Sequence, residues 1–194
     1  MVKDRDFIEN KKQTLQKLND AKSQGSVDKD ITPILDIINS KDEYYTSSSC
    51  YGRIVVLEIP KIGDKKNAVF LGKWHRKIST DEILEPIKKA KKGQIWFLAQ
   101  SPIIHIYAKT QSAADKILKT AIGCGFKHSG LKSIEKNIVV EITSTERLDS
   151  PVGIDGKLLC NSNHLNLLVK IANEIIDKSY VKLDKFENFL RKNL

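Results

Sequence analysis

The chain has 194 residues, of which 40% are hydrophobic, and its formal net charge is +9 at pH 7. This length can bury one substantial core, so we expect a single domain over residues 1–194, with terminal helices in 1–40 and 162–194 packed on an α/β core in 44–160. No run approaches the roughly 18 apolar residues of a membrane helix, and the positive charge favours a polyanionic partner such as RNA.

Cysteine usage and the N-terminus indicate the compartment. The cysteines, Cys50, Cys124 and Cys160, are odd in number and lack C-x-x-C spacing, which argues against a disulfide framework and a zinc site. The first residues are charged and show no apolar segment of a signal peptide. We therefore expect a cytoplasmic protein with no bound metal and no membrane association.

Hydrophobic periodicity and turn signals predict the elements in chain order. They are helices over 4–23 and 32–38, strands over 51–59 and 68–74, a helix over 79–92, strands over 94–100 and 103–108, a helix over 112–122, strands over 126–133 and 138–143, and a long helix from 162. Thr32-Pro33 supplies a helix start, and Ser79 to Glu82 has capping-box spacing. Pro86 either kinks or starts the helix over 79–92.

The order of these elements predicts the fold class. A β-β-α-β half followed by a β-α-β-β half hints at an internal duplication, with the two middle helices covering one sheet and the terminal helices packed outside. No glycine-rich dinucleotide fingerprint follows a strand. The predicted class is α+β with a mixed or mainly antiparallel sheet and helices outside, and it is not a Rossmann fold.

The most informative segment is Ser47-Ser48-Ser49-Cys50-Tyr51-Gly52-Arg53-Ile54, interpreted as a polar turn that enters an apolar strand. It offers hydroxyls, a thiol, backbone N–H groups and a guanidinium where loops tend to carry function, although an ordinary Ser/Gly turn has the same composition. We expect residues 47–53 and the turn over 125–130 to converge on one cleft. Cys50 is a nucleophile paired with His75 or His105, a structural thiol, or part of a binding loop.

Arg53 begins a strand of apolar residues, and Glu141 interrupts another. The guanidinium either binds a carboxylate or phosphate, or forms a salt bridge to Glu58 or Glu141. Glu141 either pairs with Arg53 or binds a ribose diol.

Histidine, aromatic and lysine residues supply the other candidates. His75 follows Trp74 at a strand end, a suitable place for a functional group, whereas a histidine inside an apolar strand, such as His105, is by default a buried core residue. The aromatic residues Trp74, Tyr51, Tyr107 and Trp96 can each stack on a base, although core packing is favoured for Trp96. The basic cluster over 88–92 either contacts RNA or forms a solvated helix end.

Blocks spread over residues 5–175 resemble, in order, the tRNA wybutosine-synthesizing protein 3 family. The similar blocks are Thr46–Ile54 (family TSSC-small-GRI), Trp74-His75, Pro102–Ile106 (PFILHV), Gly125–Leu131 (GFRNSGI), Val140–Thr145 with Arg147, Pro151-Val152, and Gly156–Leu159. Ala108 stands where the family often has Cys, and Lys127-His128 replaces Arg-Asn, which puts a role for those side chains in doubt.

The resemblance implies an S-adenosyl-L-methionine-dependent N-methyltransferase of the wyosine-type tricyclic base in the anticodon loop of tRNA-Phe. His75 is then the expected catalytic proton acceptor. The expected cofactor-binding residues are Ser48, Ser49, Cys50, Gly52, Arg53 and Glu141. The expected substrate-binding residues are Trp74, His105, Phe126, Ser129, Gly130, Lys88 and Lys89.

Two other functions stay open at this stage. A basic RNA-binding protein without catalysis would not bind S-adenosyl-L-methionine. A hydrolase or transferase that depends on Cys50 would lose its activity on thiol alkylation.

Overall fold

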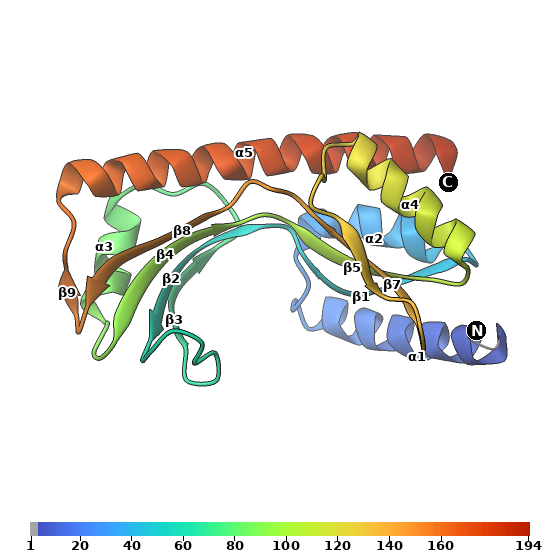
Figure 1. The fold of residues 1–194 in the computed structure, drawn as a ribbon, viewed down its shortest axis with the longest axis horizontal. Helices are drawn as coiled ribbons and strands as arrows, with labels where there is room; N and C mark the ends of the chain where they lie inside the picture. The colour runs from blue at the N-terminus through green and yellow to red at the C-terminus, as the bar shows by residue number, and fades with distance from the viewer. Residues whose placement is uncertain (1–3) are drawn as a thin grey trace. The chain divides into compact units, whose positions relative to one another are not determined.

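The strands form two separate antiparallel sheets (Figure 1). The computed structural model describes residues 4–194. The chain divides into unit 1, which is Met1–Tyr51, Pro102–Thr145 and Tyr180–Leu194, and unit 2, which is Gly52–Ser101 and Glu146–Ser179. The single domain over residues 1–194 stays a prediction. The expectation that both middle helices cover one sheet is wrong, because each unit has its own sheet and its own middle helix.

Unit 1 contains a sheet with the strand order β1-β5-β7-β6. Its elements are α1 (Asp4–Ser23), the 3-10 helix η1 (Lys29–Ile31), α2 (Thr32–Asn39), β1 (Tyr44–Cys50), β5 (Ile103–Ala108), α4 (Gln111–Gly123), β6 (Gly130–Ser133), β7 (Ile138–Thr143) and the end of α5 (Ser162–Asn193). One sheet face packs with α2, α4 and the end of α5 around buried residues such as Ile104, Phe126 and Phe186. The other face meets α1 through Phe7, whose ring centroid lies 5.1 Å from that of Tyr45.

Strand β1 contains a bulge at the serine run. Thr46 pairs with Ile106 and Ser49 pairs with Ile104, so Ser47 and Ser48 both stand opposite the single residue His105. A bulge of this kind re-aims one side chain of the strand. Asn39 fixes its beginning, because its Oδ1 accepts a 2.8 Å hydrogen bond from Thr46 N.

Unit 2 contains a sheet with the strand order β3-β2-β4-β8-β9. Its elements are β2 (Arg53–Ile59), β3 (Val69–Trp74), α3 (Asp81–Lys88), β4 (Gln94–Gln100), β8 (Leu148–Ile154), β9 (Lys157–Leu158) and the first part of α5. Residues alternate across this sheet, with Ile54, Val56 and Phe97 fully buried on one face. None of the described helices is long and apolar enough to cross a membrane.

The end of α3 is determined by Glu58. Its Oε1 accepts hydrogen bonds from Lys91 N at 2.6 Å and Lys92 N at 2.5 Å, so these N–H groups are not available to continue the helix. Gly93 follows with a φ of +98°, and a Cβ there would lie 2.3 Å from Ile59 O, so only glycine fits. The predicted helix over 79–92 therefore ends at Lys88, with Pro86 inside it.

The predicted α+β class without a Rossmann sheet is confirmed, as are most elements. Two local expectations were wrong, and two strands were missed. Residues 47–50 belong to strand β1 rather than to a turn, residues 126–129 precede β6 rather than forming part of it, and β8 and β9 were not predicted.

Candidate functional site

Four polar side chains lie in a line across the sheet of unit 1. Ser48 Oγ lies 2.7 Å from His105 Nδ1, and His105 Nε2 lies 2.9 Å from Glu141 Oε2. Lys132 Nζ lies 2.8 Å from the other carboxylate oxygen, Glu141 Oε1. Each of the strands β1, β5, β7 and β6 contributes one of these residues. We refer to Ser48, His105, Glu141 and Lys132 as the polar row.

Strand pairing explains why the members of the polar row meet. His105 pairs directly with Glu141, so the two side chains emerge on the same face of the sheet. The bulge in β1 directs Ser48 to the same ring. The side chains of His105 and Glu141 are 26% and 17% exposed, so His105 is not the buried core histidine that its apolar strand favoured.

The charge on Glu141 determines which atoms of the polar row donate hydrogen bonds and which accept them. Burial raises the pKa of the Glu141 carboxyl, but hydrogen bonds from Lys132 and His105 lower this pKa by more, so that it lies below its ordinary value. The ionised carboxylate can only accept, so His105 Nε2 carries a hydrogen. In the neutral ring, Nδ1 then accepts a hydrogen bond from the Ser48 hydroxyl. The imidazole, held in this orientation, polarises that hydroxyl.

A pocket of about 440 Å³, the serine pocket, adjoins the polar row at Ser48. It is lined by Thr14, Lys17, Leu18, Ala21, Ser26, Val27, Ser47, Ser48 and Ser49. Its volume lies in the range of about 300–1,000 Å³ that is typical of small-molecule sites. Hydroxyl groups and apolar side chains stand together in it, which suits a ligand with a polar and an apolar part.

A smaller pocket of about 160 Å³ adjoins the other end of the polar row. It is lined by His128, Gly130, Leu131, Lys132, Glu141 and Thr143. Ser129 holds the turn beside it, because its Oγ accepts from Thr143 N at 3.1 Å and donates to Thr143 O at 3.3 Å. The serine run and the turn over 125–130 thus line two different pockets, and the polar row connects them.

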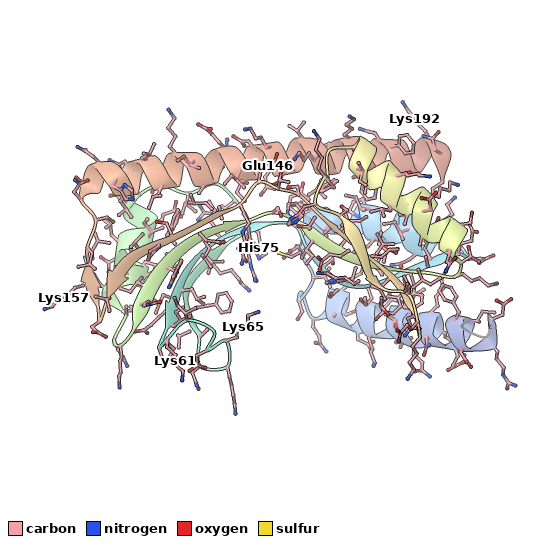
Figure 2. The ribbon with its side chains drawn as sticks, viewed as in Figure 1. Lys61, Lys65, His75, Glu146, Lys157 and Lys192 are labelled. Atoms are coloured by element: carbon pink, nitrogen blue, oxygen red, sulfur yellow. The ribbon has the colours of Figure 1, made fainter. Side chains whose placement is uncertain are left out.

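In unit 2, His75 follows β3 directly (Figure 2). Its Nδ1 lies 3.0 Å from the carbonyl oxygen of Gly52. A carbonyl can only accept, so Nδ1 carries the hydrogen, and the neutral ring has its acceptor at Nε2. This is the tautomer that a proton acceptor requires. Trp74, just before it, folds its ring over Gly72, where a Cβ would come within 2.3 Å of the indole.

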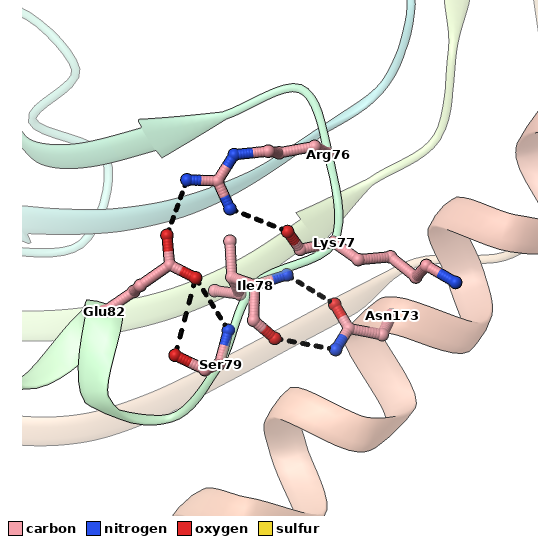
Figure 3. Close-up of polar contacts among 6 residues, drawn as sticks. All are labelled: Arg76, Lys77, Ile78, Ser79, Glu82 and Asn173. Carbon is pink, nitrogen blue, oxygen red and sulfur yellow. Dashed lines mark hydrogen bonds and ion pairs between the residues drawn. The ribbon is translucent and has the colours of Figure 1, made fainter.

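The segment after His75 is anchored from two sides (Figure 3). Asn173 of α5 accepts a hydrogen bond from Ile78 N at 3.0 Å and donates one to Ile78 O at 2.8 Å. Glu82 accepts from Arg76 Nη2 at 2.6 Å and from Ser79 N at 2.9 Å, which completes half of the predicted capping box. These contacts limit the conformations open to the connection that carries His75.

Arg53 forms neither of the salt bridges considered from the sequence. Its Nε donates a 2.7 Å hydrogen bond to Gln100 Oε1, and its guanidinium carbon lies 5.4 Å from the centre of the Phe70 ring. Glu58 is engaged at the end of α3, and Glu141 belongs to the polar row.

The structure brings several predicted site residues together within each unit. In unit 1 these are Ser48, Ser49, His105, Ser129, Gly130 and Glu141, and Cys50 is half-buried in β1. In unit 2 these are Gly52 and His75, whereas Lys88 and Lys89 are exposed at the end of α3. Phe126 is fully buried against Phe186, so we withdraw it from the substrate site. Lys132 was missed, because a single lysine in a short strand gives no sequence signal.

Comparison with known proteins identifies closely similar chains. The family model described as "Methyltransferase TYW3" matches residues 9–192. A Thermococcus sibiricus protein named tRNA(Phe) 7-((3-amino-3-carboxypropyl)-4-demethylwyosine(37)-N(4))-methyltransferase is 46% identical over 97% of this chain and 96% of its own length. A Pyrococcus horikoshii protein of the same name, numbered 1, is 48% identical over 94% and 95%. A solved structure of a Pyrococcus horikoshii protein superposes with a TM-score of 0.91 at 47% identity, covering 96% of this chain and 97% of that one.

Proposed function

The chain belongs to the TYW3 methyltransferase family, and we propose that it methylates N-4 of 7-aminocarboxypropyl-demethylwyosine at position 37 of tRNA-Phe. The observation that carries this proposal is the identity of 46% and 48%, over nearly the whole chain, with two relatives named for that reaction. The net charge of +9 supports a polyanionic substrate. Because that substrate is a tRNA, we place the reaction in the cytoplasm.

The proposed methyl donor is S-adenosyl-L-methionine, held in the serine pocket. This molecule combines a carboxylate and a ribose diol with an apolar adenine face, so its site needs hydrogen-bond donors beside apolar side chains. The serine pocket offers the hydroxyls of Ser48 and Ser49 next to Leu18 and Val27. When bound, the molecule supplies an electrophilic methyl group.

The other predicted cofactor residues divide into three groups. Cys50 remains a proposed contact of the cofactor in this pocket, whereas the cofactor contacts expected of Gly52 and Arg53 stay predictions from the sequence. Glu141 is already bound by Lys132 and His105, so we assign it a positioning role, in which it fixes His105 and through it the hydroxyl of Ser48.

Methylation of the ring nitrogen would form a nitrogen–carbon bond while the sulfur–methyl bond of the donor breaks and its thioether leaves, and the nitrogen must give up one proton. We propose His75 as the acceptor of that proton, because the bond from its Nδ1 to Gly52 O leaves Nε2 as the basic atom of the ring. The residues around the smaller pocket, Ser129 and Gly130 among them, are proposed to contact the target base. Trp74 and His105 are proposed substrate contacts, and Lys88 and Lys89 are proposed phosphate contacts. The target nucleotide lies in a single-stranded loop, so it can be splayed out without melting a duplex.

The test is methyl transfer by the purified protein. We expect S-adenosyl-L-methionine carrying a labelled methyl group to label precursor tRNA-Phe, and nucleoside mass spectrometry to place the added 14 mass units, about one CH₂, on the tricyclic base. Guanosine-37 tRNA-Phe without the tricyclic base is the control, and it should stay unlabelled. RNA binding without methyl transfer would favour a non-catalytic RNA-binding protein. Loss of activity in a folded Cys50→Ser protein would favour covalent catalysis.

A further inference from the structure

The sheet of unit 2 carries an apolar row on the face opposite its core. Leu57 pairs with Phe70 on one side and with Trp96 on the other, and Trp96 pairs with Pro151. Directly paired residues share a face, so these four side chains stand next to one another across β3, β2, β4 and β8. We refer to Phe70, Leu57, Trp96 and Pro151 as the sheet platform.

The sheet platform is open, whereas the other face of the same strands is closed. Phe70 is 54% exposed, Pro151 is exposed, and Leu57 and Trp96 are half-buried. The Trp96 indole N–H already donates to Gln94 Oε1 at 3.1 Å, so the ring itself is the part of the side chain left to contact a partner. A contiguous exposed row of this kind marks an interaction surface.

Cations surround the sheet platform without carboxylate partners. The guanidinium of Arg53 lies over the Phe70 ring, and its hydrogen bond to Gln100 holds it there. Lys73 is exposed on the neighbouring row, opposite Val55. Within residues 4–194, none of the lysines at the β2–β3 connection and on β3 forms an ion pair; these are Lys61, Lys65, Lys66 and Lys73.

The acidic groups near these cations are engaged elsewhere. Asp64, in the same connection, accepts hydrogen bonds from the backbone and side-chain nitrogens of Asn67. Asp149, beside Leu98 on the same face, pairs with Arg147. Figure 2 shows Lys61 and Lys65 at the β2–β3 connection. The surface is therefore both positively charged and aromatic.

We infer that the sheet platform binds single-stranded RNA, with bases stacked on Phe70 and Trp96 and phosphates on Lys73 and the lysines of the β2–β3 connection. Bases have an aromatic face and phosphates a negative charge, so RNA matches both features of the surface at once. An apolar protein partner would leave the lysines unpaired. The inference rests on the proposed function, because it assigns to unit 2 a contact with the tRNA loop.

The test uses the two tryptophans of the sequence, Trp74 and Trp96, as separate reporters. In the Trp74→Phe protein, Trp96 is the sole indole. In the Trp96→Phe protein, the sole indole is that of Trp74. Each is titrated with an unmodified anticodon stem-loop transcript of tRNA-Phe and with a fully paired RNA duplex of equal charge. We expect the stem-loop to quench Trp96, and the duplex to leave its fluorescence unchanged.

Affinity variants test the same surface independently. Phe70→Leu and Trp96→Leu should each raise the Kd for the stem-loop by about 5- to 150-fold, the loss of one stacked base, in proteins that circular dichroism shows to be folded. Phe189→Leu is the matched control, because Phe189 is 42% exposed on α5 in unit 1, and it should leave the Kd unchanged. Replacement of Lys61, Lys65 and Lys66 by Ala should reduce the slope of log affinity against log salt by about two units.

Several outcomes would overturn the inference: unchanged stem-loop affinity of folded Phe70→Leu and Trp96→Leu proteins, equal quenching of Trp96 by the duplex, or a dimer that Phe70→Leu dissociates while RNA affinity stays constant. The last result would make the face an interface between two copies. Methyl transfer by the wild-type protein without quenching of Trp96 would reject this surface but keep the proposed function. Quenching of Trp96 without methyl transfer would support this surface but reject the proposed function.

Discussion

His105 Nε2 and Glu141 Oε2 lie 2.9 Å apart on paired strands, and this contact determines which ring nitrogen faces Ser48. The carboxylate holds the hydrogen on Nε2, so Nδ1 is the acceptor for the Ser48 hydroxyl. Lys132 holds the other carboxylate oxygen and keeps Glu141 ionised. The polar row therefore acts as a unit, and its orientation depends on one negative charge.

Glu141→Gln removes that charge while keeping the size of the side chain. Loss of a charge-assisted hydrogen bond of about 1.5–3 kcal/mol should lower the single-turnover methylation rate by about 10- to 150-fold. Glu135→Gln, at an exposed glutamate between β6 and β7, is the control and should match the wild type. A Glu141→Gln protein with an unchanged rate and an unchanged pH profile would show that the polar row does not orient the reaction.

His75→Ala should lower the turnover of methylation by about 10²–10⁴-fold, the range for loss of a general base. Cys50→Ser keeps the size and hydrogen-bonding capacity of the thiol position, so it should keep most of the activity. His164→Ala, at an exposed histidine near the start of α5, is the control. Single-turnover methylation of precursor tRNA measures all three. A folded, inactive Cys50→Ser protein beside an active His75→Ala protein would reverse these roles.

The sequence predicted elements well where hydrophobic periodicity and turn chemistry agree, as in α1, α4 and β5. It did not predict β1 or β8. The serine run has no alternation of polar and apolar residues, and Asp149, Pro151 and Gly153 weaken the strand signal of β8. Both strands form because a neighbouring strand offers backbone partners: β5 pairs with β1, and β4 pairs with β8. Such long-range pairing outweighs intrinsic preference in sheets.

The sequence predicted several residues of the candidate site, but it did not predict the contacts between them. The resemblance identified Ser48, His105 and Glu141 as separate candidates, but their meeting depends on strand register and on a one-residue bulge. A sequence read alone gives no register between strands that lie 50 or more residues apart, about the separation of β1 and β5. Base stacking on Trp96 was likewise ranked below core packing, because core packing is the commoner state for a tryptophan in an apolar strand.

The basic cluster at the end of α3 predicts a salt-dependent interaction with tRNA. Lys89, Lys91 and Lys92 are exposed, whereas Lys88 Nζ lies 2.6 Å from Glu85 Oε1. Replacing all four lysines by Ala should flatten the slope of log affinity against log salt by up to about four units, because Lys88 can exchange its exposed contact with Glu85 for a phosphate. Filter binding across a salt series gives the slope. An unaltered slope would place the phosphate contacts elsewhere on the chain.

The contact of Arg76 with Glu82 predicts a pH dependence. The hydrogen bond from Arg76, followed by the one from Ser79 N, lowers the pKa of the Glu82 carboxyl to about 2. A lowered pKa in the folded state means that the contact contributes fully above the ordinary value of about 4.3 and is lost as the pH falls toward 2. Carbon NMR of the carboxyl should give a midpoint near 2, and Arg76→Ala should move it toward 4. A wild-type midpoint near 4 would contradict the contact.

Asn173 of α5 predicts the largest effect on stability. Its side chain satisfies both backbone groups of Ile78, a residue that is only 6% exposed (Figure 3). Asn173→Ala leaves a buried N–H and a buried C=O without their partner, at a cost of about 1–3 kcal/mol for each group. The free energy of unfolding should therefore fall by roughly 2–6 kcal/mol. Urea denaturation measures it, with an unchanged m value as the sign that only stability has altered.

Two further substitutions separate the hydrogen bonds from the packing of the Asn173 side chain. Asn163→Ala changes an exposed asparagine of the same helix, and it should alter the free energy of unfolding by no more than about 0.5 kcal/mol. Asn173→Asp keeps the volume and the acceptor for Ile78 N but loses the donor to Ile78 O, which it replaces with a negative oxygen facing a carbonyl. It should destabilise the protein about as much as alanine does. If the aspartate variant is as stable as the wild type, the amide donor contributes nothing, and the retained hydrogen bond from Ile78 N together with side-chain packing accounts for the effect.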